Sequence, residues 1–342
     1  MNGKIPKMAL EWKGRFDLFL RPHYPRVAVG MEGGSLVALR LGVKKNRKEK
    51  GLVIEHFSQI PIPKESWSVS FTKPNILSPD RLGTVLGGVL DRLGVSKGDT
   101  LSLLLPDNVA RVNLLAFSEL PLRKKEILPL IRFRLQKTIP FRMEDAVLAY
   151  QILQRKPEGE CSLLAVVLHR KVLRQYEDLF RAHGVHPGLV DLSSLNLLNL
   201  CRHERFSRNP ASEDWLLVNF TEEFLTVAVV CGEEILFFRS KGRPSASSSN
   251  GSSNEWALRE LRGSLSYYRE RLGGKELACC VLRATTPASD GFLENLPEAT
   301  GTDTVILNPI GEFEMAAGLD PPDPLLGQRM VPLIGMGLGR KE

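Results

Sequence analysis

One pattern occurs twice in this chain: a strand, a tight turn, a second strand and then a third. The first copy begins at Arg26 and turns within GMEGGS, and the second begins at Trp215 and turns at Thr221–Glu223. Each copy leads into a helical segment and a further short apolar strand. Three strands, a helix and another strand in this order form one half of a ribonuclease-H-like layer. The repeat therefore predicts an α/β fold in which that layer is duplicated.

The composition is that of an ordinary globular protein. The 342 residues are 43% hydrophobic and 25% charged, which excludes a disordered chain and a disulfide-rich miniature scaffold. No run of 18 apolar residues occurs, and residues 1–25 lack a signal-peptide core, so a polytopic membrane protein and an exported one are also excluded. The five cysteines show no CxxC spacing, which favours reduced thiols in a cytosolic protein over disulfides or a zinc site.

The chain carries a net charge of +7, and part of the excess lies in the run KKNRKEK at 44–50. Such a run is typical of a solvated hairpin tip, and contact with anionic lipid or nucleic acid is the alternative. The run has no interleaved aromatic residues and belongs to no nucleic-acid-binding motif. We therefore expect no nucleic-acid partner.

A segment between the two copies departs from the repeated layer. It contains a strand at 109–117, a helix over Leu122–Lys137 with apolar residues at four-residue steps, two more strands and a helix over 170–182. Pro129 should kink the first helix or delay its start. The domains predicted in this way are an N-terminal extension (1–25), a first subdomain (26–103), an inserted α/β subdomain (104–182), a return helix and linker (183–212) and a second subdomain (213–342) with a flexible loop at 242–254.

Three segments in this order resemble a known family. They are residues 104–153, with LLPDNVARVNLLAF followed by LP, an amphipathic helix, PF and an acidic pair; residues 172–199; and ELRGSLSYYRERLGG at 260–274. The chain resembles the PilM-like proteins of type IV pilus assembly, which are divergent actin-like ATPases similar to the FtsA division proteins. The resemblance implies a duplicated, actin-like two-domain fold with an inserted subdomain. The family's nucleotide-covering subdomain is replaced here by the Ser/Gly loop.

The nucleotide motifs of that superfamily are degenerate in this chain. The first hairpin has Glu32 where the family has aspartate, the second has Asn219 and Thr221 in place of D-x-G, and RATT at 283–286 replaces the glycines of the adenosine turn. The glycines of the first hairpin are equally explained by a turn that needs positive φ. We therefore predict a pseudo-ATPase with no catalytic residue, no metal ion and no ATP or other cofactor. Its vestigial site consists of Glu32, Gly33, Gly34, Ser35, Asn219 and Thr221.

The resemblance also implies a role. PilM-like proteins bind the N-terminal cytosolic tail of a PilN-like single-pass inner-membrane protein and tie it to a cytosolic motor ATPase. This predicts a cytoplasmic scaffold, peripheral to the inner membrane, whose tail-binding residues are Val112, Leu114, Ile127, Ile131, Arg132, Arg134, Pro140 and Phe141. For Arg132, Arg134 and Lys137, which could meet an anionic tail or lipid headgroups, a solvated helix face is the alternative. The competing functions are a working actin-like ATPase or sugar-kinase-like phosphotransferase, and a GspL-type secretion component.

Overall fold

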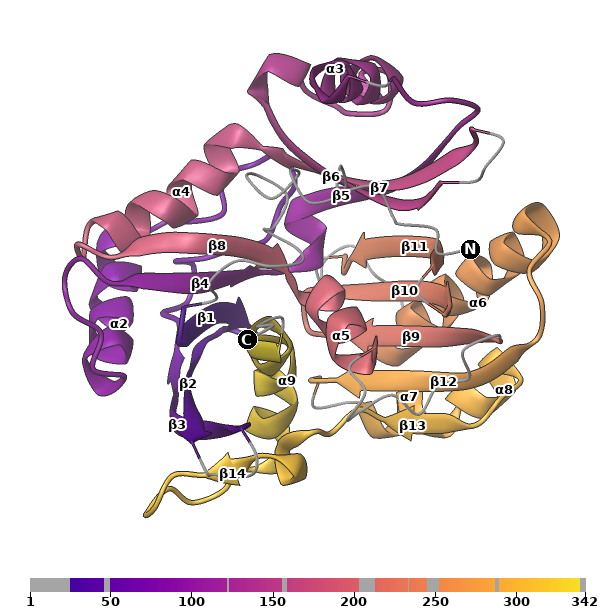
Figure 1. Cartoon of the computed structure of the whole chain (residues 1–342). Helices are drawn as coiled ribbons and strands as arrows, with labels where there is room; N and C mark the ends of the chain where they lie inside the picture. The colour runs from indigo at the N-terminus through magenta and orange to yellow at the C-terminus, as the bar shows by residue number, and fades with distance from the viewer. Residues whose placement is uncertain are drawn as a thin grey trace, which may run out of the picture.

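The computed structural model describes residues 25–45, 50–121, 123–155, 159–202, 213–232, 234–244, 252–286 and 289–338. Its strands form three sheets (Figure 1). Nearly all of the predicted N-terminal extension, the centre of the basic run at 44–50 and most of the predicted loop at 242–254 lie outside the described residues. In the described part of the chain, no helix is both long and apolar enough to cross a bilayer.

The first sheet has six strands in the order β14-β3-β2-β1-β4-β8. Strands β1, β2 and β3 pair antiparallel, whereas β4 and β8 run parallel to β1. The strands are β1 (Val27–Glu32), β2 (Ser35–Lys45), β3 (Lys50–Pro61), β4 (Thr100–Leu105), β8 (His186–Leu192) and β14 (Glu314–Met315).

The second sheet repeats this arrangement. Its order is β11-β10-β9-β12-β13, with three antiparallel strands followed by two that run parallel to β9. The strands are β9 (Asp214–Phe220), β10 (Phe224–Cys231), β11 (Glu234–Gly242), β12 (Leu277–Ala284) and β13 (Thr304–Ile306). Every residue of β9 is buried, as a strand covered on both faces requires. The matching order of the two sheets confirms the predicted duplication.

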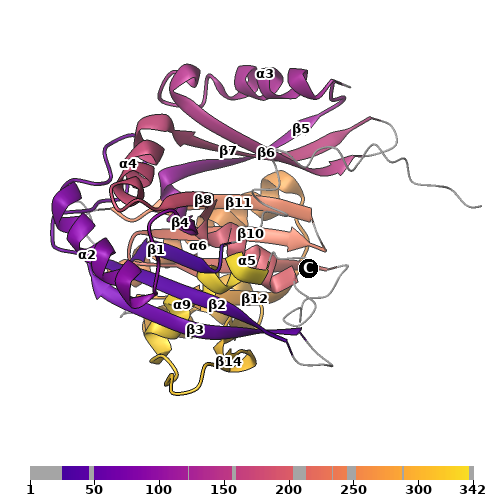
Figure 2. The same cartoon turned by 60° about the vertical axis from the view of Figure 1, so that its left-hand side comes forward.

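The helices cover the two main sheets. Two of them connect the third and fourth strands of each layer: α2 (Pro79–Arg92) and α6 (Ser253–Leu272). Helix α6 begins with a capping box between Ser252 and Glu255 and ends at Gly273 in the left-handed conformation. Helices α5 (Ser193–Arg202) and α9 (Pro324–Leu338) lie between the two sheets (Figure 1; Figure 2). The others are α4 (Arg170–Arg181), α7 (Ser289–Glu294) and α8 (Leu296–Thr300).

The inserted segment forms a small sheet of its own. Its order is β5-β7-β6, all antiparallel: β5 (Ala110–Phe117), β6 (Ala146–Arg155) and β7 (Cys161–His169). Helix α3 (Lys124–Leu135) lies on the face of this sheet that is turned away from the rest of the molecule (Figure 2). Ile127, Ile131 and Leu135 are buried against strands β6 and β7, which gives the insertion its own apolar core.

The structure differs from the sequence predictions in three places. Helix α3 starts five residues before Pro129 and runs through it, so the proline does not delay the start. Helix α4 contributes Tyr176 and Phe180 to the core of the first sheet, although the predicted inserted subdomain ran to residue 182. Strand β14 and helix α9 also pack on the first sheet, although they fall within the predicted second subdomain. In the last two cases an apolar face packs on strands outside the predicted subdomain.

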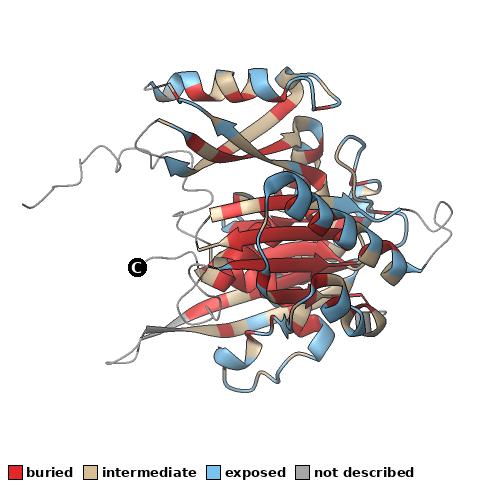
Figure 3. Ribbon diagram, turned by 90° about the vertical axis from the view of Figure 1, so that its right-hand side faces the viewer, coloured by how far each residue is buried: buried red, intermediate tan, exposed pale blue. Residues whose placement is uncertain are grey.

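Burial is highest on the strands of the second sheet and in the helices between the sheets (Figure 3). The largest apolar core lies on the first sheet and extends over one face of the second, and two smaller cores belong to the other face of the second sheet and to the insertion. The buried polar groups at the ends of β1 and β9 therefore lie in an otherwise mostly apolar region between the two main sheets.

Candidate functional site

The turns of the two repeated hairpins lie together at the centre of the molecule. The first is Gly33-Gly34, with φ of +56° and +62°, values that favour glycine. The Gly33 N–H donates to Glu223 Oε1 in the second hairpin over 2.8 Å. The Arg329 guanidinium from α9 lies so close that a Cβ at Gly33 would be 2.2 Å from its Nη2. Position 33 thus requires glycine for two reasons: its backbone has a positive φ, and the Arg329 guanidinium leaves no room for a side chain.

A buried ion pair occupies the space between the hairpins. Arg283, at the end of β12, is fully buried and places Nη2 2.9 and 3.0 Å from the two carboxylate oxygens of Glu32. The Thr285 hydroxyl donates to Glu32 Oε1 over 2.5 Å. Because charge-assisted pairs with full hydrogen bonding are the ones that tolerate burial, this geometry holds Glu32 as a structural group.

The remaining donors of Arg283 are also used. Nη1 donates to Asn219 Oδ1 over 2.9 Å, and Nε donates to the Gln328 carbonyl over 2.8 Å. The Asn219 amide in turn donates to the Ser194 hydroxyl over 2.9 Å. Arg283 therefore links β1, β9 and α9, which are far apart in the sequence.

A second buried acid joins the end of β4 to α5 and β10. Asp107, just after β4, accepts from the Ser194 N–H over 2.9 Å and from the Thr226 hydroxyl over 2.6 Å. Burial raises its pKa. The carboxylate that accepts from the first turn of α5 is thus that of Asp107, 87 residues away from Ser194. A cap supplied from another element leaves no local sequence signal.

The residues predicted as a vestigial nucleotide site divide into two groups. Glu32, Gly33 and Asn219 are brought together by the contacts just described. Thr221 instead accepts from the N–H groups of Glu223 and Phe224 within its own turn. Gly34 is exposed, and Ser35 accepts from the Gln59 side chain. The sequence missed the main partner, Arg283, which it identified only as a substitution in the adenosine turn.

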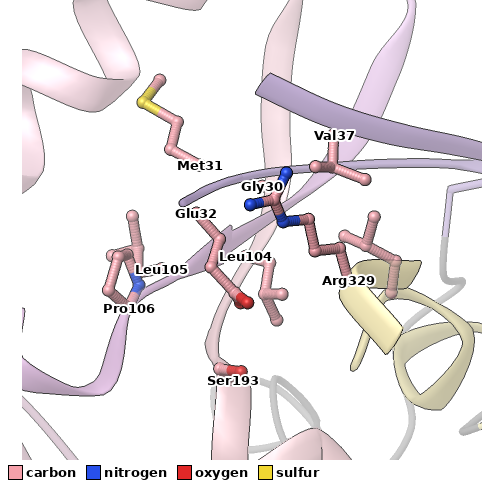
Figure 4. Close-up of a pocket in the computed structure, with 10 residues that line it drawn as sticks. Gly30, Met31, Glu32, Val37, Leu104, Leu105, Pro106, Ser193 and Arg329 are labelled. Carbon is pink, nitrogen blue, oxygen red and sulfur yellow. The ribbon is translucent and has the colours of Figure 1, made fainter. Parts of the chain in front are cut away.

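A very small cavity adjoins this network. A cavity of about 10 Å³ lies between β1, β4, α5 and α9, with Glu32, Ser193 and Arg329 among the residues around it (Figure 4). That is room for about one water molecule. The described residues contain no group of three or more His, Cys, Asp or Glu side chains that could hold a metal ion.

We call the space between the two hairpin turns, around Glu32 and Glu223, the cleft. The negative charge of one acid in the cleft, Glu223, has few favourable partners. Glu223 accepts the Gly33 N–H, and Glu32 and Glu222 are also close to it. Burial, followed by the negative charge of Glu32, raises the pKa of Glu223 to about 7. Glu222 itself lies 3.5 Å from the Arg329 guanidinium. The hairpin contact is therefore sensitive to protonation near neutral pH.

A larger and apolar cavity lies between the inserted sheet and the first sheet. It has a volume of about 230 Å³, and its wall comes from β6, β7, α4 and β8. Apolar side chains dominate the wall, among them Val147, Val166, Leu168, Leu173 and Val190. We call this cavity the groove.

The strands that border the groove have free edges. β8 is the last strand of the first sheet, and β6 is the last strand of the inserted sheet, among the strands that the structure describes. Asp191, on β8, is also among the residues that line the groove, and burial raises the pKa of its carboxyl to about 8. The groove thus combines apolar walls, unpaired backbone and one buried acid.

The predicted tail-binding residues do not line this groove. Ile127 and Ile131 are 1% and 0% exposed in the core of the insertion, so they offer no docking surface, which corrects the prediction for both. Their four-residue spacing marked a buried helix face. Val112 and Leu114 are partly buried and pack against the apolar core of the first sheet.

The other four predicted residues lie on α3 and in the turn that follows it. Arg132 donates to the Met143 carbonyl over 2.5 Å, whereas Arg134 and Pro140 are exposed. Phe141 packs on Phe71 and His169, with ring centroids 5.0 and 4.5 Å away. The apolar alternation of β6 and β7 was the signal that could have identified the groove residues, since one face of each strand is covered by α3.

The similarity of this chain to known proteins is detected in its structure and not in its sequence. No family model and no curated protein matches the sequence. A chain of the PilM–PilN type IV pilus biogenesis complex matches with a TM-score of 0.72 over 93% of this chain and 98% of that chain, at 15% identity. The fold is actin-like. This confirms the predicted fold and the resemblance to PilM-like proteins at the level of the fold.

Two further solved structures are similar to a lower degree. A Bacteroides thetaiotaomicron protein of unknown function with an actin-like ATPase fold matches with a TM-score of 0.49 at 12% identity, over 83% of this chain and 90% of that one. The cytoplasmic domain of EpsL, an inner-membrane component of the Vibrio cholerae type II secretion system, matches with a TM-score of 0.47 at 13% identity, over 92% and 95%.

Proposed function

We propose that this chain is a scaffold of a type IV pilus or related secretion assembly, and that it binds the N-terminal cytosolic tail of a PilN-like inner-membrane protein in the groove. The observation that carries the proposal is the groove itself, an apolar cavity of about 230 Å³ bordered by two free strand edges. An extended peptide satisfies its own backbone by adding to such an edge, and its apolar side chains fill the cavity.

The similarity to a chain solved as a PilM–PilN complex supports the choice of partner. The tail suited to this groove is extended and mostly apolar, with one hydrogen-bonding group opposite Asp191. The scaffold would then lie at the cytoplasmic face of the inner membrane, held there by its partner. From that position it would contact a cytosolic motor ATPase.

We further propose that the chain does not hydrolyse nucleotide. Phosphoryl transfer depends on a positioned metal ion and on room for the phosphates between the hairpins. Here the Glu32 carboxylate is paired with Arg283, and the adjoining cavity has room for about one water. Binding ATP would require separation of this pair, which opposes binding.

A calorimetric titration tests both parts. The ligand is a peptide with the N-terminal cytosolic residues of the PilN-like protein from the same genome, titrated with and without Mg-ATP. We expect saturable peptide binding that Mg-ATP does not change. Peptide that fails to bind would overturn the docking role, and ATP turnover would overturn the second part.

A steric block locates the site. Ala149 lies on β6 in the wall of the groove, so Ala149→Trp should fill the cavity and weaken peptide binding at least tenfold, about 1.4 kcal/mol. The matched control is Ala116→Trp on β5, because Ala116 is exposed and lies outside the groove. Equal affinities for the two variants would place the tail elsewhere.

A further inference from the structure

Helix α3 and the turn after it carry a dense positive charge. Residues 123–142 (RKKEILPLIRFRLQKTIPFR) include seven Lys or Arg and one acidic residue, a net charge of +6 in a chain whose total is +7. The function proposed above uses none of this charge. Its position on the outermost helix of the insertion therefore calls for a separate explanation.

The helix presents this charge outward. Ile127, Ile131 and Leu135 form the buried row, and the residues two positions away lie on the opposite side of the helix. That opposite row contains Lys125, Pro129 and Phe133, and Lys137 follows in the turn after the helix; all four are exposed. Figure 3 shows α3 at the edge of the molecule, with exposed residues along its outer side.

The outer row has an aromatic residue at its centre. The Phe133 side chain is 71% exposed, the largest value among the exposed large apolar residues of the described chain. Arg134 follows it in the sequence but lies on the flank of the helix, three residues from the buried Ile131, and Lys137 lies one turn beyond Phe133. Clusters of Lys and Arg attract anionic lipid headgroups, and an exposed aromatic side chain can enter the headgroup region.

The cations on this face are free to meet a ligand. Among the described residues, Arg134 and Lys137 have no ion-pair partner. Arg123 pairs only weakly with Glu126, at 3.8 Å between two exposed side chains. Unlike the groove, the face is the convex outer side of a helix, and none of the described cavities is lined by its residues.

We propose that the outward face of α3 binds a surface of anionic phospholipid headgroups, with Phe133 at the interface and Lys125, Arg134 and Lys137 around it. Charge complementarity selects an anionic surface. The convex shape favours lipid over an acidic protein patch, because lipids rearrange beneath a ridge whereas a folded partner would need a matching hollow. This contact does not depend on the groove.

Co-sedimentation of the full chain with vesicles tests the proposal without any partner protein. We expect binding to vesicles of phosphatidylglycerol and phosphatidylcholine in equal amounts, none to phosphatidylcholine alone, and a loss of binding as salt rises. Each cation near an anionic membrane contributes roughly a fivefold change in partitioning. Arg134→Gln with Lys137→Gln should therefore weaken binding about 25-fold.

The matched control removes two exposed cations from another face. Arg81 and Arg92 lie on α2, so Arg81→Gln with Arg92→Gln changes the net charge equally and should alter binding less than threefold if only long-range attraction is affected. Equal losses in the two double variants would overturn the proposal. Unchanged binding in the α3 variant would do the same.

A spectroscopic reading tests the position of Phe133. The emission of a tryptophan placed there by Phe133→Trp should shift to the blue when anionic vesicles are added, in excess of any shift of the wild-type protein. Because the side chain is exposed, the substitution should not disturb folding, which a thermal melt checks. An absent extra shift, or failure of the chain to bind anionic vesicles at all, would favour an acidic protein as the partner of this face and overturn the lipid assignment.

Discussion

The cleft between the repeated hairpins and the groove beneath the insertion are opposites. In the cleft, Glu32, Arg283 and Asn219 bond to one another and leave room for about one water molecule. In the groove, apolar side chains and two free strand edges surround about 230 Å³. Among the described residues, polar side chains fill the space between the hairpin turns, whereas the groove is open and mostly apolar. Changes in the cleft should therefore alter stability, and changes in the groove should alter binding.

The largest effect should follow from removing Arg283. Arg283→Ala leaves the Glu32 carboxylate buried without its partner, and loss of one member of a buried pair costs about 3–5 kcal/mol. Urea unfolding followed by circular dichroism measures it. The double variant Arg283→Met with Glu32→Gln should recover much of the loss, since no buried charge remains. If Arg283→Ala unfolds at the wild-type urea concentration, the cleft is not the closed structure described here.

A smaller loss is expected at the first hairpin. Gly33→Ala should cost about 2 kcal/mol, because the added Cβ meets both a positive φ and the Arg329 guanidinium. Gly34→Ala is the matched control: its φ is similar, but no atom lies within 4 Å of the added Cβ, so about 1 kcal/mol is expected. Both are read from urea unfolding. Equal losses would show that Arg329 contributes nothing to the turn.

Glu223 should give the cleft a pH dependence. Its pKa of about 7 in the folded protein exceeds the ordinary value of 4.5, so the folded state holds the proton more tightly than the unfolded chain does. The resulting stability is present below about pH 4.5 and is lost as the pH rises through 7. Glu223→Gln keeps an acceptor for the Gly33 N–H and removes the titration. We expect it to be more stable than the wild type by up to about 3 kcal/mol at about pH 8, and by less than about 1 kcal/mol at about pH 5. A difference of the opposite sign would contradict the raised pKa.

The smallest effect should come from the groove and should appear in binding alone. Asp191→Asn preserves the shape of the protonated acid and its acceptor for the Leu192 N–H. Peptide affinity should fall about fivefold, near 1 kcal/mol for one hydrogen bond, with little change in unfolding. Titration of the peptide against the variant measures it. A loss of stability at unchanged affinity would assign Asp191 to the fold.

The sequence predicted the parts of this molecule that local patterns encode. Alternating strands and the glycine turn at 33–34 were enough for the duplicated layer, and the four-residue spacing of Ile127, Ile131 and Leu135 was enough for α3. It did not predict that these isoleucines face inward, because periodicity marks an apolar face without naming what covers it. The predicted set Glu32, Gly33 and Asn219 does converge, but its main partner is 251 residues from Glu32. Only the tertiary structure brings Arg283 there.

The return of α9 to the first sheet has a consequence for biosynthesis. Met330, Val331, Leu333 and Ile334 are almost fully buried in the core that also contains the first strands, β1 and β2. The core of the first sheet therefore remains incomplete until α9 has been synthesised. Until then apolar surface of the first sheet is exposed to solvent. Because such surface promotes aggregation, we expect chaperones to assist the folding of the nascent chain.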